Sequence, residues 1–358
     1  MTDTVAQTPS HAVLARQDSR RRAVAVVVTA IGVTVLAGAI ALAIGPVSID
    51  PRLVPGIMSH HILGTSLPAD VTETIDHIVW RTRAPRIAMG LVAGAGLAVA
   101  GALLQALVRN GLADPYLLGI NAGASTGVAT AVLVIGGVTG LMMSAAALLG
   151  AIGATALVLF LAGSASTRGP LRLVLAGLAV GYALNAVTSF LLFWTDSPEA
   201  ARAVLFWLLG SLVAVQPVTL AVAACVTGLA IGLFIGWAPR VDAMASGDDS
   251  ALSAGLDPER TRFGYLAGAS AMVGVIVAGV GGVGFVGLVV PHLARALVGG
   301  RHRAVLPVCA ALGATLLVAA DTVARTALAP MEIPVGVVTG VIGAPFLLLL
   351  LRRPTSRS

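Results

Sequence analysis

Three arginines in the stretch WRTRAPRIAMG, residues 80–90, stand directly in front of a long apolar run. They are Arg81, Arg83 and Arg86. A guanidinium group can hold a carboxylate through two parallel hydrogen bonds, so pairing with an acidic group is one chemistry open to these residues. The alternative is that they extend along the lipid and place their charges among phospholipid headgroups. The choice depends on which side of a membrane they face.

Other residues that could do chemistry are few. His60 and His61 are adjacent, but a metal site needs more ligands within reach than this pair supplies, so we expect none. The sequence contains no lysine, which excludes the ATP-binding P-loop. It also contains no nucleophile elbow and no zinc motif. We therefore expect neither an enzymatic activity nor a cofactor in this chain.

The composition indicates a membrane protein. Hydrophobic residues make up 57% of the 358 residues and charged residues only 11%, whereas soluble proteins are about 25% charged. A chain this apolar cannot cover itself with a water-compatible surface. The first apolar run, 23–44, follows three arginines and is longer than the apolar region of a signal peptide. We therefore expect it to be an uncleaved first membrane helix.

Ten apolar runs are separated by short polar or Pro/Gly-containing breaks, and we expect each to form a transmembrane helix. Their ranges are 23–44, 86–108, 115–135, 141–163, 171–194, 217–237, 263–282, 284–298, 305–325 and 335–351. The run 203–213 is too short to span a bilayer and is expected at the interface. Between the seventh and eighth runs, the glycines of GVGGVGFVG permit a sharp reversal of the chain.

Ten spans place both termini on one side of the membrane, and the arginines indicate which side. With the termini in the cytoplasm, 16 of the 22 arginines lie inside and 6 outside, which agrees with the positive-inside rule. We expect an all-α chain with cytoplasmic tails at 1–22 and 352–358 and one transmembrane domain at 23–351. Arg83 and Arg86 fall outside, against the general trend, which indicates another constraint on them.

Ionisable residues are almost absent from the expected spans. Asp321 is the main exception, and it lies toward an outer end. Ion-coupled transporters bind their ions at such groups near the middle of the bilayer. The sequence therefore disfavours ion coupling, although Asn121 and Asn185 keep this alternative open. The stretches 91–104 and 266–280 resemble each other weakly and lie five spans apart, as expected for an inverted repeat.

The expected cytoplasmic loop 238–262 contains the stretch GDDSALSAG, residues 247–255. Asp248 suits the start of a helix, and Gly255 suits its end. The small residues Ala251 and Ala254 would form a face that another protein can approach. Two interpretations are open: a docking helix for a cytoplasmic motor, or a solvated loop with a single helical turn.

Three long stretches resemble, in the same order, the signatures of FecCD-type permease subunits, which belong to ABC importers for iron-siderophores, haem and cobalamin. They are RAPRIAMGLVAGAGLAVAGALLQALVRNGLADPYLLGINAGA at 83–124, GFVGLVVPHLAR at 284–295 and EIPVGVVTGVIGAP at 332–345. Gly111 stands where the family usually has proline. The resemblance covers about residues 80–351. It implies the type II ABC importer permease fold, with two permease subunits around a central translocation path.

The resemblance also implies partners and a role for particular residues. The partners are a second permease subunit, identical or different, an extracytoplasmic binding protein, and two cytoplasmic ATPase subunits that bind ATP and Mg; nucleic acid is not among them. Residues Gly247, Asp248, Ala251, Ala254 and Gly255 would dock in a groove of the ATPase. Arg83, Arg86 and Arg325 would pair with glutamates of the binding protein. Residues Gly169, Pro170 and Leu171 resemble part of the cytoplasmic gate.

The expected function is therefore that of a permease subunit in the bacterial cytoplasmic (inner) membrane. It would import a ferric siderophore, with haem and cobalamin as alternative cargoes, using ATP hydrolysed by a separate subunit. The competing hypothesis is a self-sufficient, ion-coupled secondary transporter or channel. A third hypothesis, an isolated structural membrane protein, does not explain the docking segment.

Overall fold

The computed structural model describes residues 11–163, 171–213 and 215–351, and this part of the chain contains helices and turns but no strand. In chain order the helices are α1 (His11–Ala43), α2 (Val54–Leu63), α3 (Glu73–His77), η1 (Ile78–Arg83), α4 (Ala84–Val108), η2 (Pro115–Leu118), α5 (Ile120–Thr130), η3 (Ala131–Ile135), α6 (Gly140–Ala162), α7 (Leu171–Trp194), α8 (Pro198–Leu208), α9 (Pro217–Gly236), α10 (Ala238–Ala245), α11 (Asp248–Ser253), α12 (Pro258–Val280), α13 (Val286–Val298), α14 (His302–Thr326) and α15 (Val335–Leu351).

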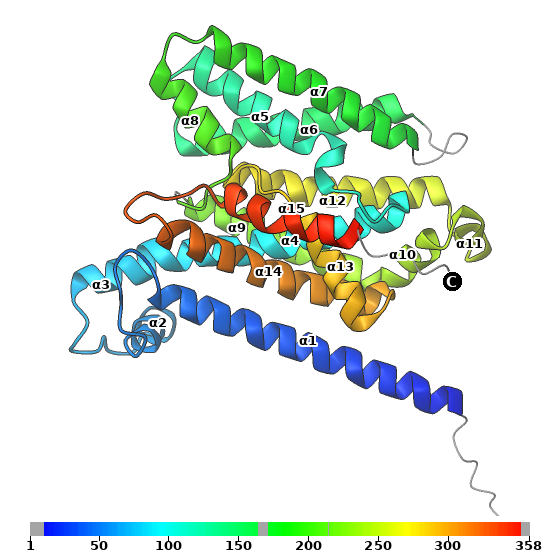
Figure 1. The fold of residues 1–358 in the computed structure, drawn as a ribbon, viewed down its shortest axis with the longest axis horizontal. Coiled ribbons are helices and arrows are strands. Elements are labelled where there is room, and N and C mark those ends of the chain that lie inside the picture. The colour runs from blue at the N-terminus through cyan, green and yellow to red at the C-terminus, as the bar shows by residue number, and fades with distance from the viewer. Residues whose placement is uncertain (1–10, 164–170, 214, 352–358) are drawn as a thin grey trace, which may run out of the picture.

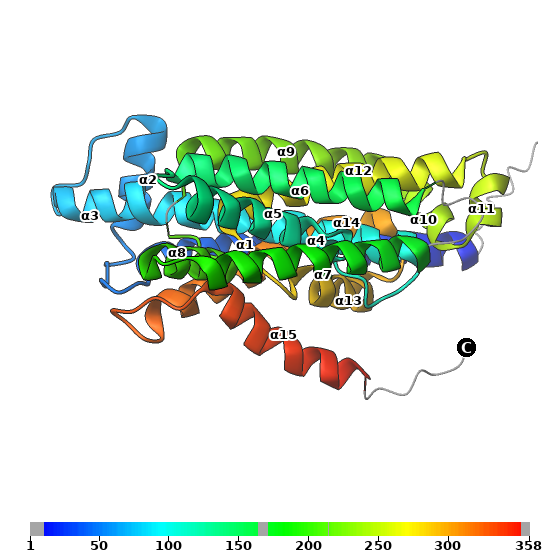
Figure 2. The ribbon, with the colours of Figure 1, turned by 90° about the horizontal axis from the view of Figure 1, so that it is seen from above.

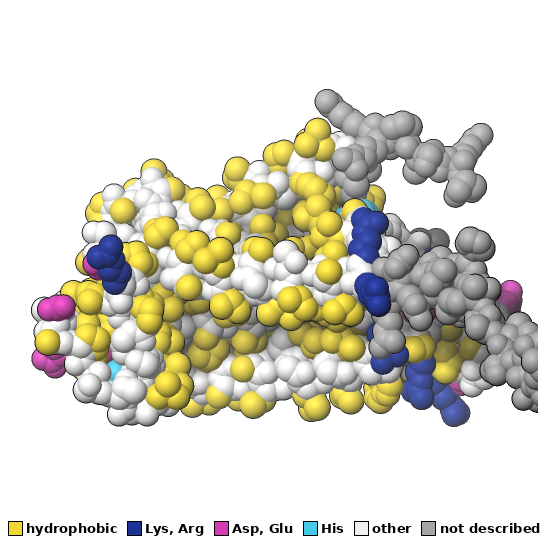
Figure 3. Space-filling view, turned by 90° about the horizontal axis from the view of Figure 1, so that it is seen from below, with side chains coloured by type: hydrophobic (Ala, Val, Ile, Leu, Met, Phe, Trp, Pro, Cys, Tyr) yellow, Lys and Arg dark blue, Asp and Glu magenta, His cyan; other side chains and the backbone are white. Residues whose placement is uncertain are grey.

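The helices match the ten runs expected from the sequence. Seven of them are long and apolar enough to cross a membrane, and three shorter apolar helices cover 120–135, 286–298 and 335–349. Figure 3 shows apolar side chains along the middle of the molecule and charged side chains gathered toward its two ends. This distribution is that of a protein whose middle lies in hydrocarbon. The run 203–213 became the short helix α8, which ends at Leu208 and does not span.

Helix α4 is at the centre of the molecule and is the most completely buried of the long helices. It packs along α14 and also contacts α9, α12 and α13 (Figure 1). A Cβ on Gly94 would overlap the carbonyl oxygen of Gly313, and a Cβ on Gly313 would overlap that of Gly94. The two backbones therefore touch directly, which is how small residues bring membrane helices together.

Helices α5, α6, α7 and α8 form a separate layer at the top of the view in Figure 1. Gly123 of α5 and Gly150 of α6 face each other in the same way, because a Cβ on either would overlap the other's carbonyl oxygen. This layer joins the central helices chiefly where α12 packs against α6 and α5.

On another side, the carboxyl end of α15 points away from the other helices (Figure 2).

The reversal expected at GVGGVGFVG is present between α12 and α13. Gly281 and Phe285 both have positive φ, at 70° and 69°, and the turn is fixed by the Tyr116 hydroxyl. This hydroxyl donates to the carbonyl oxygen of Val283 and accepts from its N–H, both at 3.0 Å. Helices α4 and α12 run in opposite directions, since Gly279 near the end of α12 lies against Met89 near the start of α4. An inverted repeat requires this arrangement.

Two segments differ from the expectation. Helix α1 begins at His11 rather than at residue 23, because the stretch HAVLARQDSRRR contains neither glycine nor proline to end it. The segment between α1 and α4 is also helical: α2, α3 and η1 enclose a small apolar cluster of their own around Ile57 and Val79. The tail 352–358 lies outside the described residues.

Candidate functional site

Arg83 is buried and caps the carboxyl end of α1. Its guanidinium donates to the carbonyl oxygens of Leu42 and Ala43 at 2.7 and 2.8 Å, and also to that of Val47. The last carbonyl groups of a helix have no partner within the helix, so a cation in this position satisfies them and complements the helix dipole. Gly45 leaves room for the guanidinium, because a Cβ there would lie 2.5 Å from Nη2.

Arg86 is held between two carboxylates. Its Nε donates to both carboxylate oxygens of Asp321 on α14 at 2.9 and 3.0 Å, and its Nη1 donates to Glu332 at 2.9 Å. The side chain is only 8% exposed, that of Asp321 3% and that of Glu332 30%. Charge-assisted pairs of this kind are strong when they are shielded from water. The cluster therefore fastens α4 to α14 and to the turn that precedes α15.

Arg325 completes this cluster. It is 2% exposed, donates to the carbonyl oxygen of Ala41 at 2.5 Å, and lies 3.7 Å from Asp321 one helical turn earlier. The structure thus brings the three predicted docking arginines together at one end of the bundle, but it gives each of them partners within the chain. Their role in docking stays a prediction. A docking carboxylate would have to compete with Glu332, the most exposed of these partners.

The exposed charges at this end of the molecule come from other residues. Arg52, Arg81 and Arg202 are exposed, together with the acidic residues Asp50, Asp70, Glu73, Asp196 and Glu199. A binding protein that approaches this surface therefore meets charges of both signs. Arg81 is the exposed arginine of the stretch that also contains Arg83 and Arg86, and its guanidinium has no ion-pair partner among the described residues.

At the opposite end of the bundle, the predicted docking segment forms the short helix α11. One carboxylate oxygen of Asp248 accepts from Nη2 of Arg109 at 2.9 Å and from Nη2 of Arg262 at 2.7 Å. Arg109 follows the last residue of α4, and Arg262 lies in the first turns of α12. Arg262 is buried, and its Nε has no hydrogen-bond partner among the described residues. Asp248 therefore connects α11 to two transmembrane helices.

The small-residue face expected on this segment is not present. Ala251 is completely buried against the chain itself, whereas Ala254 is exposed. The reason is that α11 has only six residues and the chain turns back at Gly255, at φ 75°, with Leu256 N–H donating to the carbonyl oxygen of Ala251. The exposed apolar group is instead Leu252, which is 59% exposed and which the sequence analysis did not select.

Helix α10 holds the start of this segment against the bundle. Asp242 accepts from the backbone N–H of His302 at 2.9 Å, and its Oδ1 lies 2.6 Å from the imidazole Nδ1 of the same residue. The hydroxyl of Tyr265 donates to the carbonyl oxygen of Trp237 at 2.9 Å. These contacts connect the segment 237–255 to α12 through Tyr265 and to α14 through His302.

The comparisons with known proteins match this architecture. The model of the FecCD transport family matches residues 25–353. The chain belongs to the FecCD transport family.

The names of individual relatives of this FecCD chain specify different cargoes. The cobalamin import system permease protein BtuC of Halobacterium salinarum is 41% identical over 79% of this chain and 75% of its own length. The Fe(3+) dicitrate permease protein FecD of Escherichia coli is 38% identical over 77% of this chain and 86% of its own length. The hemin permease protein HmuU of Yersinia pestis is 37% identical over 79% of this chain and 85% of its own length.

A solved structure shares the fold of this FecCD chain. It is an inward-facing conformation of a putative metal-chelate type ABC transporter, with a TM-score of 0.78 and 26% identity over 92% of this chain and 99% of that one. The fold is therefore that of an ABC importer permease. A transport permease is not an enzyme, and among the described residues no group of three or more His, Cys, Asp or Glu is placed to hold a metal.

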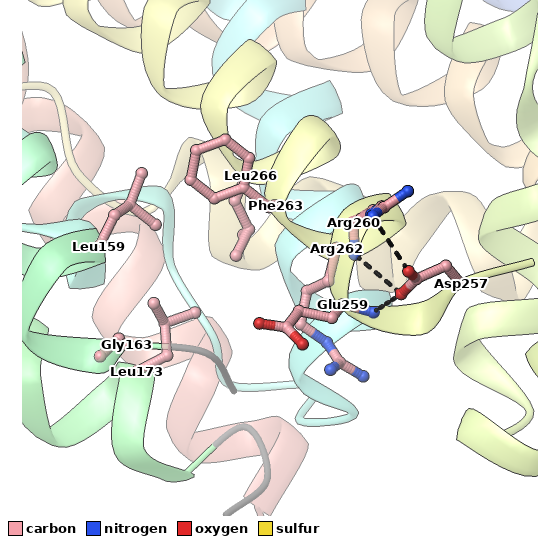
Figure 4. A pocket seen from close by; sticks show the side chains of 10 residues that line it. Leu159, Gly163, Leu173, Asp257, Glu259, Arg260, Arg262, Phe263 and Leu266 are labelled. Carbon is pink, nitrogen blue, oxygen red and sulfur yellow. Dashed lines mark hydrogen bonds and ion pairs between the residues drawn. The ribbon is translucent and has the colours of Figure 1, made fainter. Parts of the chain in front are cut away.

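The predicted gate of the FecCD chain lies mostly outside the described residues. Gly169 and Pro170 belong to the segment 164–170, and of Leu171 only the backbone, at the start of α7, is described. Beside this position is a cavity of about 510 Å³ between α6, α7 and α12 (Figure 4). Its walls combine apolar residues such as Leu159 and Phe263 with the charged residues Glu259 and Arg260.

Proposed function

We propose that this chain is the membrane-spanning permease subunit of an ABC importer for a ferric siderophore, driven by ATP hydrolysis in separate subunits. Membership of the FecCD transport family supports the import function. The cargo is the finer part of the proposal. Relatives named for ferric dicitrate, ferric hydroxamate and hemin support an iron chelate, and relatives named for cobalamin define the alternative.

The observation that carries the ATP-driven mechanism is the attachment of α11. An exposed leucine on a short helix gives a motor protein an apolar contact, and Asp248 passes a displacement of this helix to α4 and α12. Two ATPase subunits, with bound ATP and Mg, would act here on a pair of permease subunits. The gate residues 169–171 lie between α6 and α7 in the chain, with Leu171 the first residue of α7, so movement of α6 and α7 would open or close the inner end of the path.

The proposal places this end in the cytoplasm and the arginine cluster outside. Both termini of the chain then lie in the cytoplasm and the protein lies in the inner membrane, in agreement with the positive-inside rule. The binding protein would dock at the outer end. Arg86 would exchange Glu332 for a carboxylate of the binding protein, while Arg83 and Arg325 hold α1 in place behind it.

Reconstitution tests the function directly. Purified permease is placed in liposomes with its ATPase and binding protein, and uptake of radiolabelled ferric siderophore is measured. Uptake is expected only with ATP inside the liposomes and both partners present. Uptake by the permease alone on a clamped ion gradient would contradict the proposal and support a secondary transporter. Competition by haem or cobalamin at equal concentration would reassign the cargo and leave the import function intact.

A further inference from the structure

A second polar site lies at the same end of the bundle as α11, and its central charge, Arg295, takes no part in the proposed transport mechanism. It is an open pocket of about 430 Å³ between the end of α4, the end of α13 and the start of α14. Its polar lining consists of Gln105, Arg109, Asn110, His292, Arg295 and His302 and includes no carboxylate. We call it the inner basic pocket.

Arg295 is the charge that defines the inner basic pocket. Its Nη2 donates to Oε1 of Gln105 at 2.5 Å, and none of the described carboxylates lies within ion-pair distance of it. A partly buried guanidinium whose partner is a neutral amide retains its full charge, and burial of such a charge is costly without an anion. The site therefore favours a negatively charged ligand.

Gln105 shows that this arrangement is built into the fold. Its side chain is 4% exposed, and its amide nitrogen donates to the carbonyl oxygens of Gly287 and Leu288 at 3.4 and 3.3 Å. These contacts from α13 direct Oε1 toward Arg295 and hold the guanidinium in one position. A preformed donor binds an anion with little loss of side-chain entropy.

Asn110 supplies a further donor to the pocket, whereas His292 does not. The imidazole Nδ1 of His292 donates to the carbonyl oxygen of Leu288 at 3.2 Å, so Nε2, which lies beside Gly111, is an acceptor in the neutral ring. Asn110 accepts from Leu112 N–H through Oδ1, and its NH₂ group is left as a donor.

The nearby carboxylates do not neutralise the pocket. Asp248 binds both Arg109 and Arg262, so one negative charge is shared by two positive ones. Asp242 is engaged by His302. Arg301 adds exposed positive charge immediately before α14. The local charge is therefore positive even with every ion pair formed.

We propose that the inner basic pocket binds the phosphate group of an anionic ligand, held by Arg295 together with Asn110. Basic pockets between transmembrane helices at the cytoplasmic surface are suited to anionic lipid headgroups, and in the orientation proposed above this pocket, at the end of α4, lies on that side. A free phosphate compound of the cytoplasm presents the same chemistry. The site stands on these side chains alone and is independent of the proposed cargo.

The experiment measures thermal unfolding of the full chain in detergent at constant ionic strength. One series adds phosphatidylglycerol, with phosphatidylcholine as the zwitterionic comparison, and a second series adds inorganic diphosphate. Selective stabilisation by phosphatidylglycerol assigns the site to a lipid, and stabilisation by diphosphate assigns it to a soluble ligand. Arg295→Gln should weaken the apparent affinity by about tenfold or more, as expected for loss of a charge-assisted hydrogen bond.

Arg303→Gln is the matched control, because Arg303 is exposed on the neighbouring turn and does not line the pocket. It should bind as the unmodified chain does. If Arg295→Gln does not fold, Gly111→Leu replaces it: this side chain would fill the space beside His292 and should also abolish binding while Arg295 is retained. Absence of stabilisation by either ligand, or equal losses in Arg295→Gln and Arg303→Gln, would overturn the proposal.

Discussion

The carboxylate of Asp248 lies 2.7 Å from the guanidinium of Arg262, and this contact joins the exposed helix α11 to the first turns of the transmembrane helix α12. The same carboxylate oxygen also accepts from Arg109 at the end of α4. A hydrogen bond between charged groups is directional, so it transmits a displacement of α11 better than an apolar contact does. This relationship makes Asp248 the first residue to change.

Asp248→Asn retains the size of the side chain and removes its charge. Loss of a hydrogen bond to a charged group costs about 1.5–3 kcal/mol, so amide exchange in α11 should become about tenfold faster or more. Uptake in reconstituted liposomes should fall more than ATP hydrolysis does. The ATPase subunits would still hydrolyse ATP, but α11 would be less firmly attached to α4 and α12. Asp249→Asn is the control, since Asp249 is exposed and its side chain has no described partner. Equal exchange rates in the two variants would show that Asp248 does not fasten α11.

Leu252 is the second residue to change, because it is the exposed apolar group of α11. Leu252→Asp should weaken assembly with the ATPase, measured by co-purification, without lowering the melting temperature of the permease alone. Leu252→Met should retain assembly because it conserves apolar volume. Unchanged co-purification of Leu252→Asp would move the ATPase contact away from this helix.

Glu332 tests whether Arg86 takes part in docking. Glu332→Gln removes the charge that would compete with a carboxylate of the binding protein, so association should become tighter and more sensitive to salt. The control is Glu199→Gln, which removes an exposed negative charge elsewhere on the same end of the molecule. Affinities can be compared by surface plasmon resonance at two salt concentrations. An equal gain in both variants would mean that only the general surface charge matters.

Gly94 tests the close packing of α4 and α14. Gly94→Val forces a side chain into the backbone of Gly313, and overpacking of this kind costs about 1–3 kcal/mol or more. The melting temperature in detergent should therefore fall. Gly153→Val is the matched control, because a Cβ on Gly153 of α6 meets no atom within 4 Å. A similar decrease in both variants would point to the general effect of valine in a helix.

The sequence predicted the ten apolar helices and the reversal at GVGGVGFVG well, because hydropathy and glycine content act locally along the chain. The sequence did not predict the partners of Arg83. These partners are carbonyl groups at the end of α1, and tertiary packing brings them to the arginine. The pair Asp321 and Arg325 could have been found, because residues four apart lie on one helical face.

The sequence also did not predict which side chains of α11 are buried. The spacing of Ala251 and Ala254 placed them on one face of an ideal helix, but α11 is too short to have a regular exposed face, and Ala251 turned inward. Arg109 and Arg262 were likewise missed as partners of Asp248, because they come from helices far away in the sequence. A search for arginines at the same end of expected neighbouring helices would have suggested them.

The direct backbone contact between α4 and α14 has a consequence for how the path can open. Two helices that touch through Gly94 and Gly313, and that are joined at one end by Arg86 and Asp321, cannot slide past each other without losing both contacts. They must move as one rigid body, and α1 moves with them because Arg325 and Arg83 hold its last turn. We therefore expect the transport rearrangement to change the packing of this unit against the layer α5–α8 and against α15, and to leave the packing within the unit unchanged.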